Sequence, residues 1–224
     1  MPRVDLYKNV HMGQRARLFG LAVELGAACA AKPGALADLA ERCLAMVQEL
    51  REHADHEDTY IHPLLRERAP EAADALDAEH VRLDAVLATL GHRARTLPTV
   101  HAEALPAAQH DLYLALNELI GAYLAHLHAE ETVAMPALWE RCTDDELGAV
   151  FDAFRASRTH EDGVADLRRM LPFLPPGTRA AIVRAVLDGS PAEQADRILD
   201  AVSATLGPGQ RTRLCEDLAG SRAQ

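Results

Sequence analysis

A pair of similar segments constrains this chain more than any other feature of its sequence. The first, REHADHEDTYIHPLL, begins at residue 51, and the second, HLHAEETVAMPAL, begins at residue 126. In each, a histidine is followed four residues later by a glutamate and ten residues later by a proline: His53, Glu57 and Pro63, then His126, Glu130 and Pro136. Residues four apart share one face of a helix, so each copy can direct an imidazole and a carboxylate to one point.

The surrounding apolar residues place both His–Glu pairs inside apolar seams. Steps of four and three link the residues of each seam: Leu39, Cys43, Met46, Leu50, His53, Glu57, Tyr60 and Leu64, then Leu112, Leu116, Leu119, Tyr123, His126, Glu130, Val133 and Ala137. A single His–Glu pair is compatible with a solvated surface pair. A glutamate inside a buried seam, however, is costly unless it is paired or binds a metal. The shared register therefore favours a metal site.

The composition predicts an all-α fold. The chain is rich in alanine, leucine, glutamate and arginine, only 4% of its residues are aromatic, and no alternating strand pattern stands out. Long helices are expected at about 4–31, 35–68, 71–96 and 107–141. Pro63 is expected to kink the second helix or loosen its last turn. With short connections, these helices predict an up-down-up-down four-helix bundle.

Single histidines interrupt the apolar seams of the first and third predicted helices, at His11 and His80. A helix with one histidine, followed by a helix with a His–Glu pair, therefore occurs twice. Four imidazoles and two carboxylates suit two metal ions bridged by the glutamates. Nitrogen and oxygen ligands without thiolate fit iron or manganese better than structural zinc.

The pattern changes beyond Cys142, where shorter predicted helices separated by PFLPPG and LGPG replace the long ones. Only one histidine, His160, occurs there. We predict that residues 1–142 form the bundle domain and that residues 143–224 form a helical extension that packs on the bundle or on a protein partner.

Charge and cysteine content limit the classes of function. The formal net charge of −11 argues against nucleic-acid binding, because a phosphate backbone would be repelled. No segment approaches the roughly 18 consecutive apolar residues of a membrane helix. The four cysteines are widely separated and form no Cys-x-x-Cys motif, which argues against a zinc ribbon or a thioredoxin-type pair. The expected location is a reducing cytoplasm.

The ordered series of a histidine, a His-x-x-x-Glu, a histidine and a second His-x-x-x-Glu resembles the hemerythrin-like (HHE cation-binding) family over roughly residues 1–142. The resemblance implies two iron ions in an oxo- or hydroxo-bridged centre, in preference to manganese or zinc, with Glu57 and Glu130 as the bridges. The implied ligands are His11, His53, Glu57, His80, His126 and Glu130.

Two departures from the oxygen-storing hemerythrins argue against reversible oxygen carriage. Those proteins have a second histidine four residues after the third-helix histidine, where this chain has Asp84. They also have an aspartate five residues after the fourth-helix histidine, whereas here Glu130 follows His126 by four.

Several other polar residues stand near the motifs. His56, His62 and His128 lie off the seams and are expected at the surface or outside the ligand shell, while contributions of His160, His56 or Asp84 to the metal site stay open. Gln14, Tyr60 and Tyr123 are each one turn from a predicted ligand, where they either pack in the seam or hydrogen-bond a bound oxygen species.

The function favoured by the sequence is that of a non-haem di-iron protein that binds and reduces O2, H2O2 or NO. Whether it turns over as an enzyme stays open, with peroxidase- or catalase-like and NO-reducing activities as the choices. The alternatives are an iron or oxygen sensor that acts through a protein partner of residues 143–224, and an iron donor for iron–sulfur cluster repair.

Overall fold

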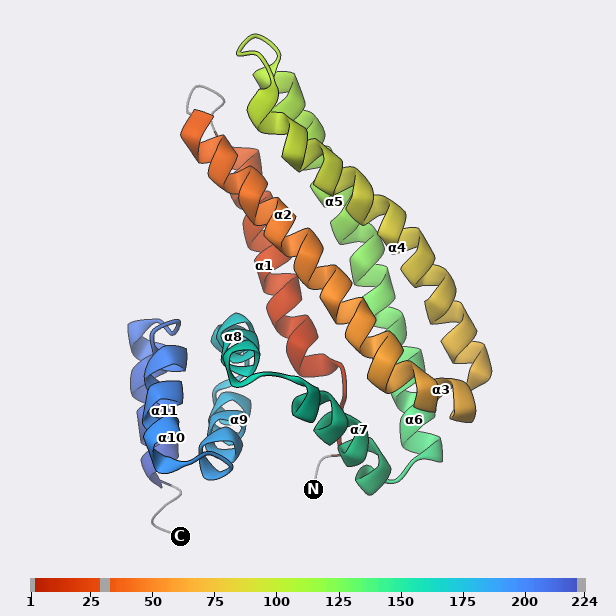
Figure 1. Ribbon diagram of the computed structural model, residues 1–224, viewed down its shortest axis with the longest axis vertical. Coiled ribbons are helices and arrows are strands. Elements are labelled where there is room, and N and C mark those ends of the chain that lie inside the picture. Colours follow the sequence, from red (N-terminus) through yellow and green to blue (C-terminus); the bar gives the residue numbers. More distant parts are fainter. Residues whose placement is uncertain (1–2, 29–32, 221–224) are drawn as a thin grey trace. The chain divides into compact units, whose positions relative to one another are not determined.

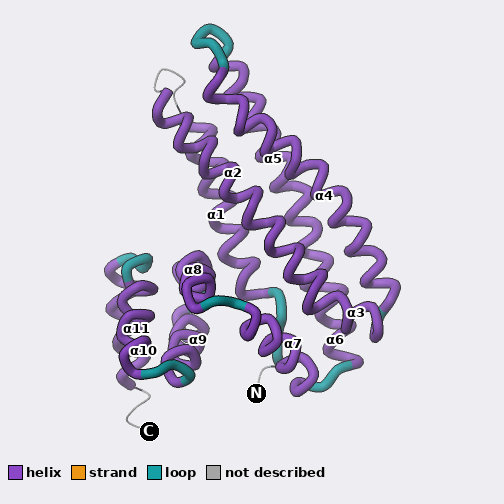
Figure 2. The backbone as a smooth tube through the Cα atoms, viewed as in Figure 1, coloured by secondary structure: helices purple, strands orange, loops and turns teal. Residues whose placement is uncertain are grey.

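The fold was analysed in a computed structural model that describes residues 3–28 and 33–220. Every regular element in these ranges is a helix, as Figure 2 shows. Four helices are long: α1 (Lys8–Ala27), α2 (Pro33–His56), α4 (Pro70–Thr96) and α5 (Leu105–Ala129) (Figure 1). The all-helical prediction is confirmed, and the long helices lie where the sequence places them. The predicted end of the first helix, at residue 31, falls outside the described residues.

The described chain divides into two compact units whose relative position is not determined. The first contains Met1–Tyr7 and Arg17–Phe154, and the second contains Lys8–Ala16 and Arg155–Gln224. The predicted boundary at residue 142 lies between α6 (Met135–Arg141) and α7 (Asp144–Ser157), and α7 groups with the first unit up to Phe154. The division into residues 1–142 and 143–224 stays a prediction. In residues 3–28 and 33–220, no helix is both long and apolar enough to cross a membrane.

A leucine-rich core fills the first unit. Residues 17–27 of α1 contribute three leucines to it, and α2, α4 and α5 contribute the rest at helical spacing. The largest fully buried side chains of this core are Leu18, Leu25, Leu36, Leu50, Leu90, Leu97, Leu112, Leu116, Leu119 and Leu127. Burying one such side chain contributes about 1.5–3 kcal/mol, so the core fixes the faces that the long helices present to one another.

Both helices that carry a His–Glu pair widen into a π-helix directly at the glutamate. The π-helix η1 (Glu57–Ile61) joins α2 to α3 (His62–Arg68), and η3 (Glu130–Ala134) joins α5 to α6. In each, a backbone N–H donates to the carbonyl five residues earlier: His62 to Glu57, and Met135 to Glu130. One extra residue is thereby inserted in each helix.

The prolines after the motifs give a physical reason for these π-helices. A proline inside an α-helix lacks the N–H, and its ring clashes with the carbonyl four residues earlier. Pro63 and Pro136 both lie in the first turn of the helix that follows the π-helix, where no N–H is required. The expectation that Pro63 loosens its helix is therefore met by a π-turn placed before the proline.

The extra residue moves the buried face by one position. Ile61 and Leu65 are buried in place of Tyr60 and Leu64. In the second copy, Ala134 and Leu138 are buried, whereas Val133 is 55% exposed. The predicted steps of four and three are thus correct up to each glutamate and wrong beyond it, because a period of 3.6 residues does not continue through a π-turn.

The N-terminal segment is attached to the end of α6 and the start of α7. The indole Nε1 of Trp139 donates to the carbonyl of Val4 at 2.8 Å, and Arg3 donates to the carbonyl of Cys142 at 2.7 Å. Tyr7 is buried in a second core cluster of this unit, together with Ile61, Leu65, Ala73, Leu76, Ala134, Met135, Leu138 and Leu147. These contacts carry Tyr7 to the end of the long helices that holds both glutamates.

The second unit has an apolar core of its own, formed by α8 (His160–Met170), α9 (Pro176–Asp188), α10 (Ala192–Ser203) and α11 (Pro208–Gly220). Met12 of α1 packs against this core. A Cβ at Gly13 would lie 3.0 Å from the carbonyl oxygen of Arg169 and 3.2 Å from the Cα of Met170. Glycine is therefore required where α1 approaches the backbone of α8.

The register shift can be tested with two neighbouring leucines. Leu65→Ala should lower the free energy of unfolding by about 2–5 kcal/mol, because Leu65 is fully buried. Leu64→Ala should cost about 1.5 kcal/mol or less, since Leu64 is only partly buried. Urea unfolding of both variants measures the difference, and the reverse order would mean that α-helical register continues past Glu57.

Candidate metal centre

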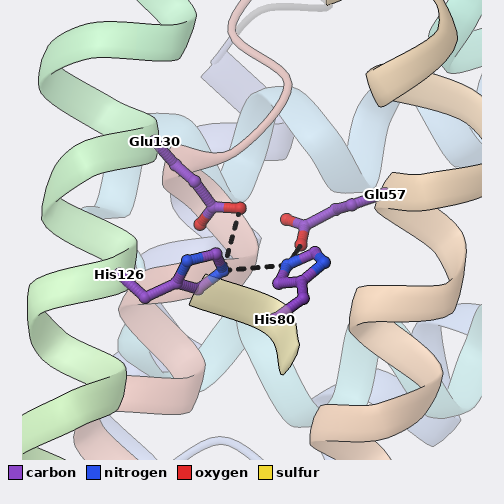
Figure 3. Close-up of side chains that lie close together, drawn as sticks. All are labelled: Glu57, His80, His126 and Glu130. Carbon is purple, nitrogen blue, oxygen red and sulfur yellow. Dashed lines mark hydrogen bonds and ion pairs between the residues drawn. The ribbon is translucent and has the colours of Figure 1, made fainter. Parts of the chain in front are cut away.

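Four side chains of the first unit converge on one point (Figure 3): Glu57, His80, His126 and Glu130. Each offers one ligand atom, and these four atoms all lie within 4.8 Å of one another. The residues come from η1, α4, α5 and η3, so four elements are required to assemble the group. Two glutamates that are 73 residues apart in sequence thereby face the same pair of imidazoles.

Glu57 faces a different histidine with each of its carboxylate oxygens. Its Oε1 lies 3.0 Å from Nε2 of His53, and its Oε2 lies 3.7 Å from Nε2 of His80. The first contact joins residues one helical turn apart, and the second reaches from η1 to α4. A carboxylate placed in this way can bind a separate ion with each oxygen.

The spacing of the remaining atoms suits ligands that share an ion. Nε2 of His80 lies 3.0 Å from Nε2 of His126, which in turn lies 3.3 Å from Oε1 of Glu130. Two imidazole nitrogens at this distance need a proton or a cation between them. Neighbouring ligand atoms on an ion with bonds of about 2.1 Å lie about 3.0–3.4 Å apart.

In both His126 and His80, the second ring nitrogen, Nδ1, is hydrogen-bonded to a carboxylate that lies outside the group of four. Nδ1–H of His126 donates to Oε2 of Glu79 at 2.9 Å, and Nδ1–H of His80 donates to Oδ1 of Asp58 at 3.1 Å. Such partners fix the tautomer that leaves Nε2 free for a metal, and they increase its basicity. Both histidines are therefore oriented as ligands.

No pattern in the sequence marks Glu79 or Asp58 as part of the site. Each stands directly beside a predicted ligand in the chain, Glu79 before His80 and Asp58 after Glu57. Adjacent helical residues point in different directions, so neither can be assigned to the site of its own helix. Each serves a histidine of a neighbouring helix, which only the packing of α4 against α5 and of η1 beside α4 decides.

The centre buries negative charge. The exposed fraction is 2% for Glu57 and 0% for Glu130. Burial opposes the charged form of His126, but the hydrogen bond and charge of Glu130, the charge of Glu57 and the hydrogen bond to Glu79 outweigh it and raise the pKa of His126 to about 9. A proton thus takes the place of a cation in the metal-free protein. Imidazole nitrogens and buried carboxylate oxygens that meet at one point form a donor set that suits a metal ion.

A cavity of about 150 Å³ reaches the centre from outside. Leu50, Leu83, Leu87 and Tyr123 form apolar walls beside His80 and His126, and three exposed acids, Asp55, Asp58 and Asp84, line it as well. At about 30 Å³ per water molecule, the cavity admits a few waters or a molecule of two to four atoms. Asp84 therefore lines the access to the centre without belonging to the converging group.

Tyr7 is a third residue whose place near the centre was not foreseen. It precedes α1 and is 1% exposed. Burial, followed by the negative charges of Glu130, Glu57 and Asp5, raises the pKa of its phenol well above the usual value. Its O–H thus stays protonated near both glutamates.

The six predicted ligands can now be placed. His53, Glu57, His80, His126 and Glu130 come together in the first unit, although their binding of metal stays a prediction. His11 is buried in α1, but its segment groups with the second unit. The role of His11 as a ligand therefore also stays a prediction. Gln14, in the same segment, is buried, and its hydrogen bond to a bound oxygen species likewise stays a prediction.

The other histidines and tyrosines fall into three situations. His128 and His160 are exposed on α5 and at the start of α8. The rings of His56 and Tyr60 pack edge-on against Phe154, with centroids 5.1 and 5.8 Å away. Tyr123 is buried, with its ring centroid 6.1 Å from that of His126.

His62 was expected either at the surface or just outside the ligand shell. It is fully buried and its ring stacks on His80 with centroids 5.2 Å apart, so the surface position is wrong and the position beside a predicted ligand is the one found. The one-residue shift caused by η1 turns it inward.

Comparison with protein families agrees with this geometry. The model of the hemerythrin HHE cation-binding domain matches residues 3–138, and the chain belongs to that family. It is therefore a hemerythrin-like protein with a His/Glu cluster suited to metal. Searches of curated proteins and of solved structures gave no match.

The orienting role of Glu79 predicts a loss of metal affinity. Glu79→Ala should weaken metal binding by about 10- to 100-fold, because Nδ1 of His126 would lose its carboxylate partner. Glu118→Ala, which removes an exposed glutamate from α5, is the control and should bind metal as the unchanged protein does. Competition with a chromophoric chelator measures both affinities, and equal affinities would contradict the role of Glu79.

The raised pKa of His126 predicts proton release on metal binding. Metal must displace the His126 proton below about pH 9, so affinity should rise by up to about tenfold per pH unit until that pH. In the metal-free protein, this group's contribution to stability is fully present below about pH 6.5 and is lost as the pH rises through about 9. Calorimetric titration in buffers of different ionisation enthalpy counts the protons; none released at pH 7 would mean that His126 is neutral.

Proposed function

We propose that this protein is a cytoplasmic non-haem di-iron protein that binds and reduces a small oxidant, O2, H2O2 or NO. The proposed ligands are those predicted from the sequence, carried by four long helices in an up-down-up-down bundle. One observation carries the proposal: the two oxygens of Glu57 face two different histidines, His53 and His80. This arrangement suits a carboxylate that joins two ions rather than one that completes a single site.

Bound iron would supply electrons to the oxidant and open coordination positions for it. The chain limits what can arrive there, because the cavity holds only a molecule of a few atoms. Leu50, Leu83 and Leu87 give part of its wall an apolar surface. O2, H2O2 and NO are all small enough for this space. O2 and NO are weakly hydrated and leave water at little cost, whereas H2O2 can hydrogen-bond the polar part of the lining.

Reduction of an oxygen species consumes protons, and Tyr7 is placed to provide one. Its phenol stays protonated because burial and the charges of Glu130 and Glu57 oppose its ionisation. When bound metal takes up the negative charge of the two glutamates, this opposition becomes weaker, and the phenol can release its proton toward the centre more readily. Tyr123, at the wall of the cavity, is the second phenol near the site.

The departures from oxygen-storing hemerythrins favour reduction over reversible carriage. Asp84 occupies the position of one of their histidines and is exposed at the cavity. With one fewer nitrogen ligand, the ions keep more open positions, and the acidic access route is open to water. Two alternatives remain, a sensor and an iron donor. Turnover of an oxidant by the isolated protein would favour reduction over both.

The function is tested by metal analysis and by reaction with oxidants. The protein purified with iron should contain two iron ions per chain, and chelation should lower its melting temperature, because two buried carboxylates lose their counter-charge. The reduced protein mixed with O2 in a stopped-flow spectrometer should oxidise without a long-lived adduct. One zinc and no iron would contradict the metal, and an adduct that disappears on degassing and returns in air would indicate a carrier.

Tyr7→Phe serves as the site variant in the same experiment. It should keep two iron ions and the melting temperature within a few degrees, but it should slow H2O2 consumption by about tenfold or more, as expected for loss of a proton donor. Tyr60→Phe is the matched control, since its ring packs against Phe154, and its rate should be unchanged.

A further inference from the structure

The cavity that reaches the metal centre has two chemically different ends. Its inner end is formed by His80 and by Glu57 and His126, which are each 2% exposed (Figure 3). Asp55 and Asp84 line the same cavity, but their side chains are exposed, so they stand at its outer end. A molecule that enters must therefore pass exposed carboxylates before it meets the predicted ligands.

The carboxylates at the outer end keep their charge uncompensated. Within residues 3–28 and 33–220, neither Asp55 nor Asp84 takes part in an ion pair. Arg51, the one arginine of the lining, stands one helical turn before Asp55 and forms no ion pair with it in these residues. The exposed acids of the cavity outnumber this arginine, so the opening carries net negative charge.

Bound metal would create the opposite field at the inner end. Metal ions are the largest local charges of a site, and two glutamates cancel only part of the charge of two ions. The loaded centre by itself would therefore attract small anions to its open positions. Leu83 and Leu87 give the cavity an apolar wall, next to which charges are screened less than in bulk water.

Asp84 has no place among the predicted ligands. It belongs to none of the groups of convergent ligand atoms found in residues 3–28 and 33–220. Asp58, in contrast, accepts a hydrogen bond from Nδ1 of His80 at 3.1 Å, so a change of Asp58 would disturb a ligand. Asp84 is thus the acid at which the charge of the opening can be changed without altering the ligand group.

We propose that Asp84, together with Asp55, is a charge filter that admits uncharged oxidants to the centre and holds back small anions. The inference rests on the proposed function and narrows its substrate class. O2, NO and H2O2 pass as neutral molecules at pH 7, whereas superoxide, nitrite and chloride are repelled at the opening. Because the filter acts on entry, it lowers the association rate of an anion and leaves the metal content unchanged.

Azide tests the filter, since it is a small anion at pH 7 that binds ferric iron and changes its absorption. The oxidised, iron-loaded protein is mixed with azide in a stopped-flow spectrometer at low ionic strength. Asp84→Asn should raise the association rate constant about two- to fourfold, as expected for one charge at about 10 Å in water-like surroundings. Asp84→Lys should raise it further. Binding of uncharged NO to the reduced protein should proceed at the same rate in all three proteins.

Glu103→Gln is the matched control, because it removes the same charge from an exposed residue between η2 (Leu97–Thr99) and α5. Asp84 lies twelve residues before the end of α4 at Thr96, which is about 18 Å along the helix. Glu103 is therefore remote from the opening, and its variant should bind azide at the unchanged rate. An equal increase in Glu103→Gln and Asp84→Asn would mean that overall charge governs entry, and it would overturn the filter.

Ionic strength separates an effect of charge from an effect of shape. The screening length falls from about 30 Å at 0.01 M to about 3 Å at 1 M. The azide rates of the unchanged protein and of Asp84→Asn should therefore converge when a sodium organosulfonate, whose anion is too large for the cavity, is added. A difference that persists at high ionic strength, or no difference at low ionic strength, would contradict a filter that acts through charge.

Failure of the proposed function would be seen separately. Iron content is measured first, and fewer than two irons per chain contradicts the di-iron centre. The protein loaded with Co2+, whose visible absorption also changes on binding azide, then tests the filter by the same rates. A reversible O2 adduct would likewise overturn reduction, while the azide rates would still decide the filter.

Discussion

The burial of Glu57 and Glu130 is the constraint on which the rest of the first unit depends. Two carboxylates with almost no exposed surface cannot keep their charge unless positive charge is supplied nearby. The imidazoles of His53, His80 and His126 face them, and the charges of the two glutamates raise the pKa of His126 to about 9, which favours a proton on this imidazole in the metal-free protein at neutral pH. Metal replaces that proton with more charge and with directed bonds, so stability, metal affinity and pH are linked through the same few atoms. The leucine-rich core serves this arrangement by packing α2, α4 and α5 against one another with these residues on the facing sides.

The two π-helices have a larger effect than their length suggests. Each one places an extra residue between a glutamate and a proline, so that everything beyond the glutamate turns by about 100° relative to a continuous α-helix. In η1 and the following α3, this turns Ile61, His62 and Leu65 inward. Tyr60 and Leu64 are turned toward the surface and are only partly buried. The π-turn therefore decides which polar residues accompany the metal centre. It removes one of the tyrosines that the α-helical pattern places next to the ligands, and it adds a histidine that the pattern places outside.

Carboxylates around the histidines extend the centre outward. Glu79 and Asp58 hold the ring nitrogens that do not face the metal, and Asp58, Asp55 and Asp84 line the access route. These three acids outnumber the one arginine of the lining, Arg51, so the access route favours cations over anions. Asp58 takes part in both arrangements, since it orients His80 and also approaches His62. Tyr7, held by the N-terminal segment, adds a protonated group beside both glutamates.

The sequence by itself determined the long helices, the His–Glu pairs and the single histidine of the third helix, because these depend on local spacing along one helix. It located five residues that the tertiary structure brings together in one unit, His53, Glu57, His80, His126 and Glu130. The sequence could not place Glu79, Asp58 or Tyr7 at the site, since each acts on a residue of another element and no periodicity within its own segment marks it. It also left open whether His62 lies at the surface or beside the ligands, although Pro63 next to it was the available signal. Whether a helix accommodates a proline by bending or by a π-turn depends on how its following turn packs against α4 and α6, and that packing is decided only when the whole chain is folded.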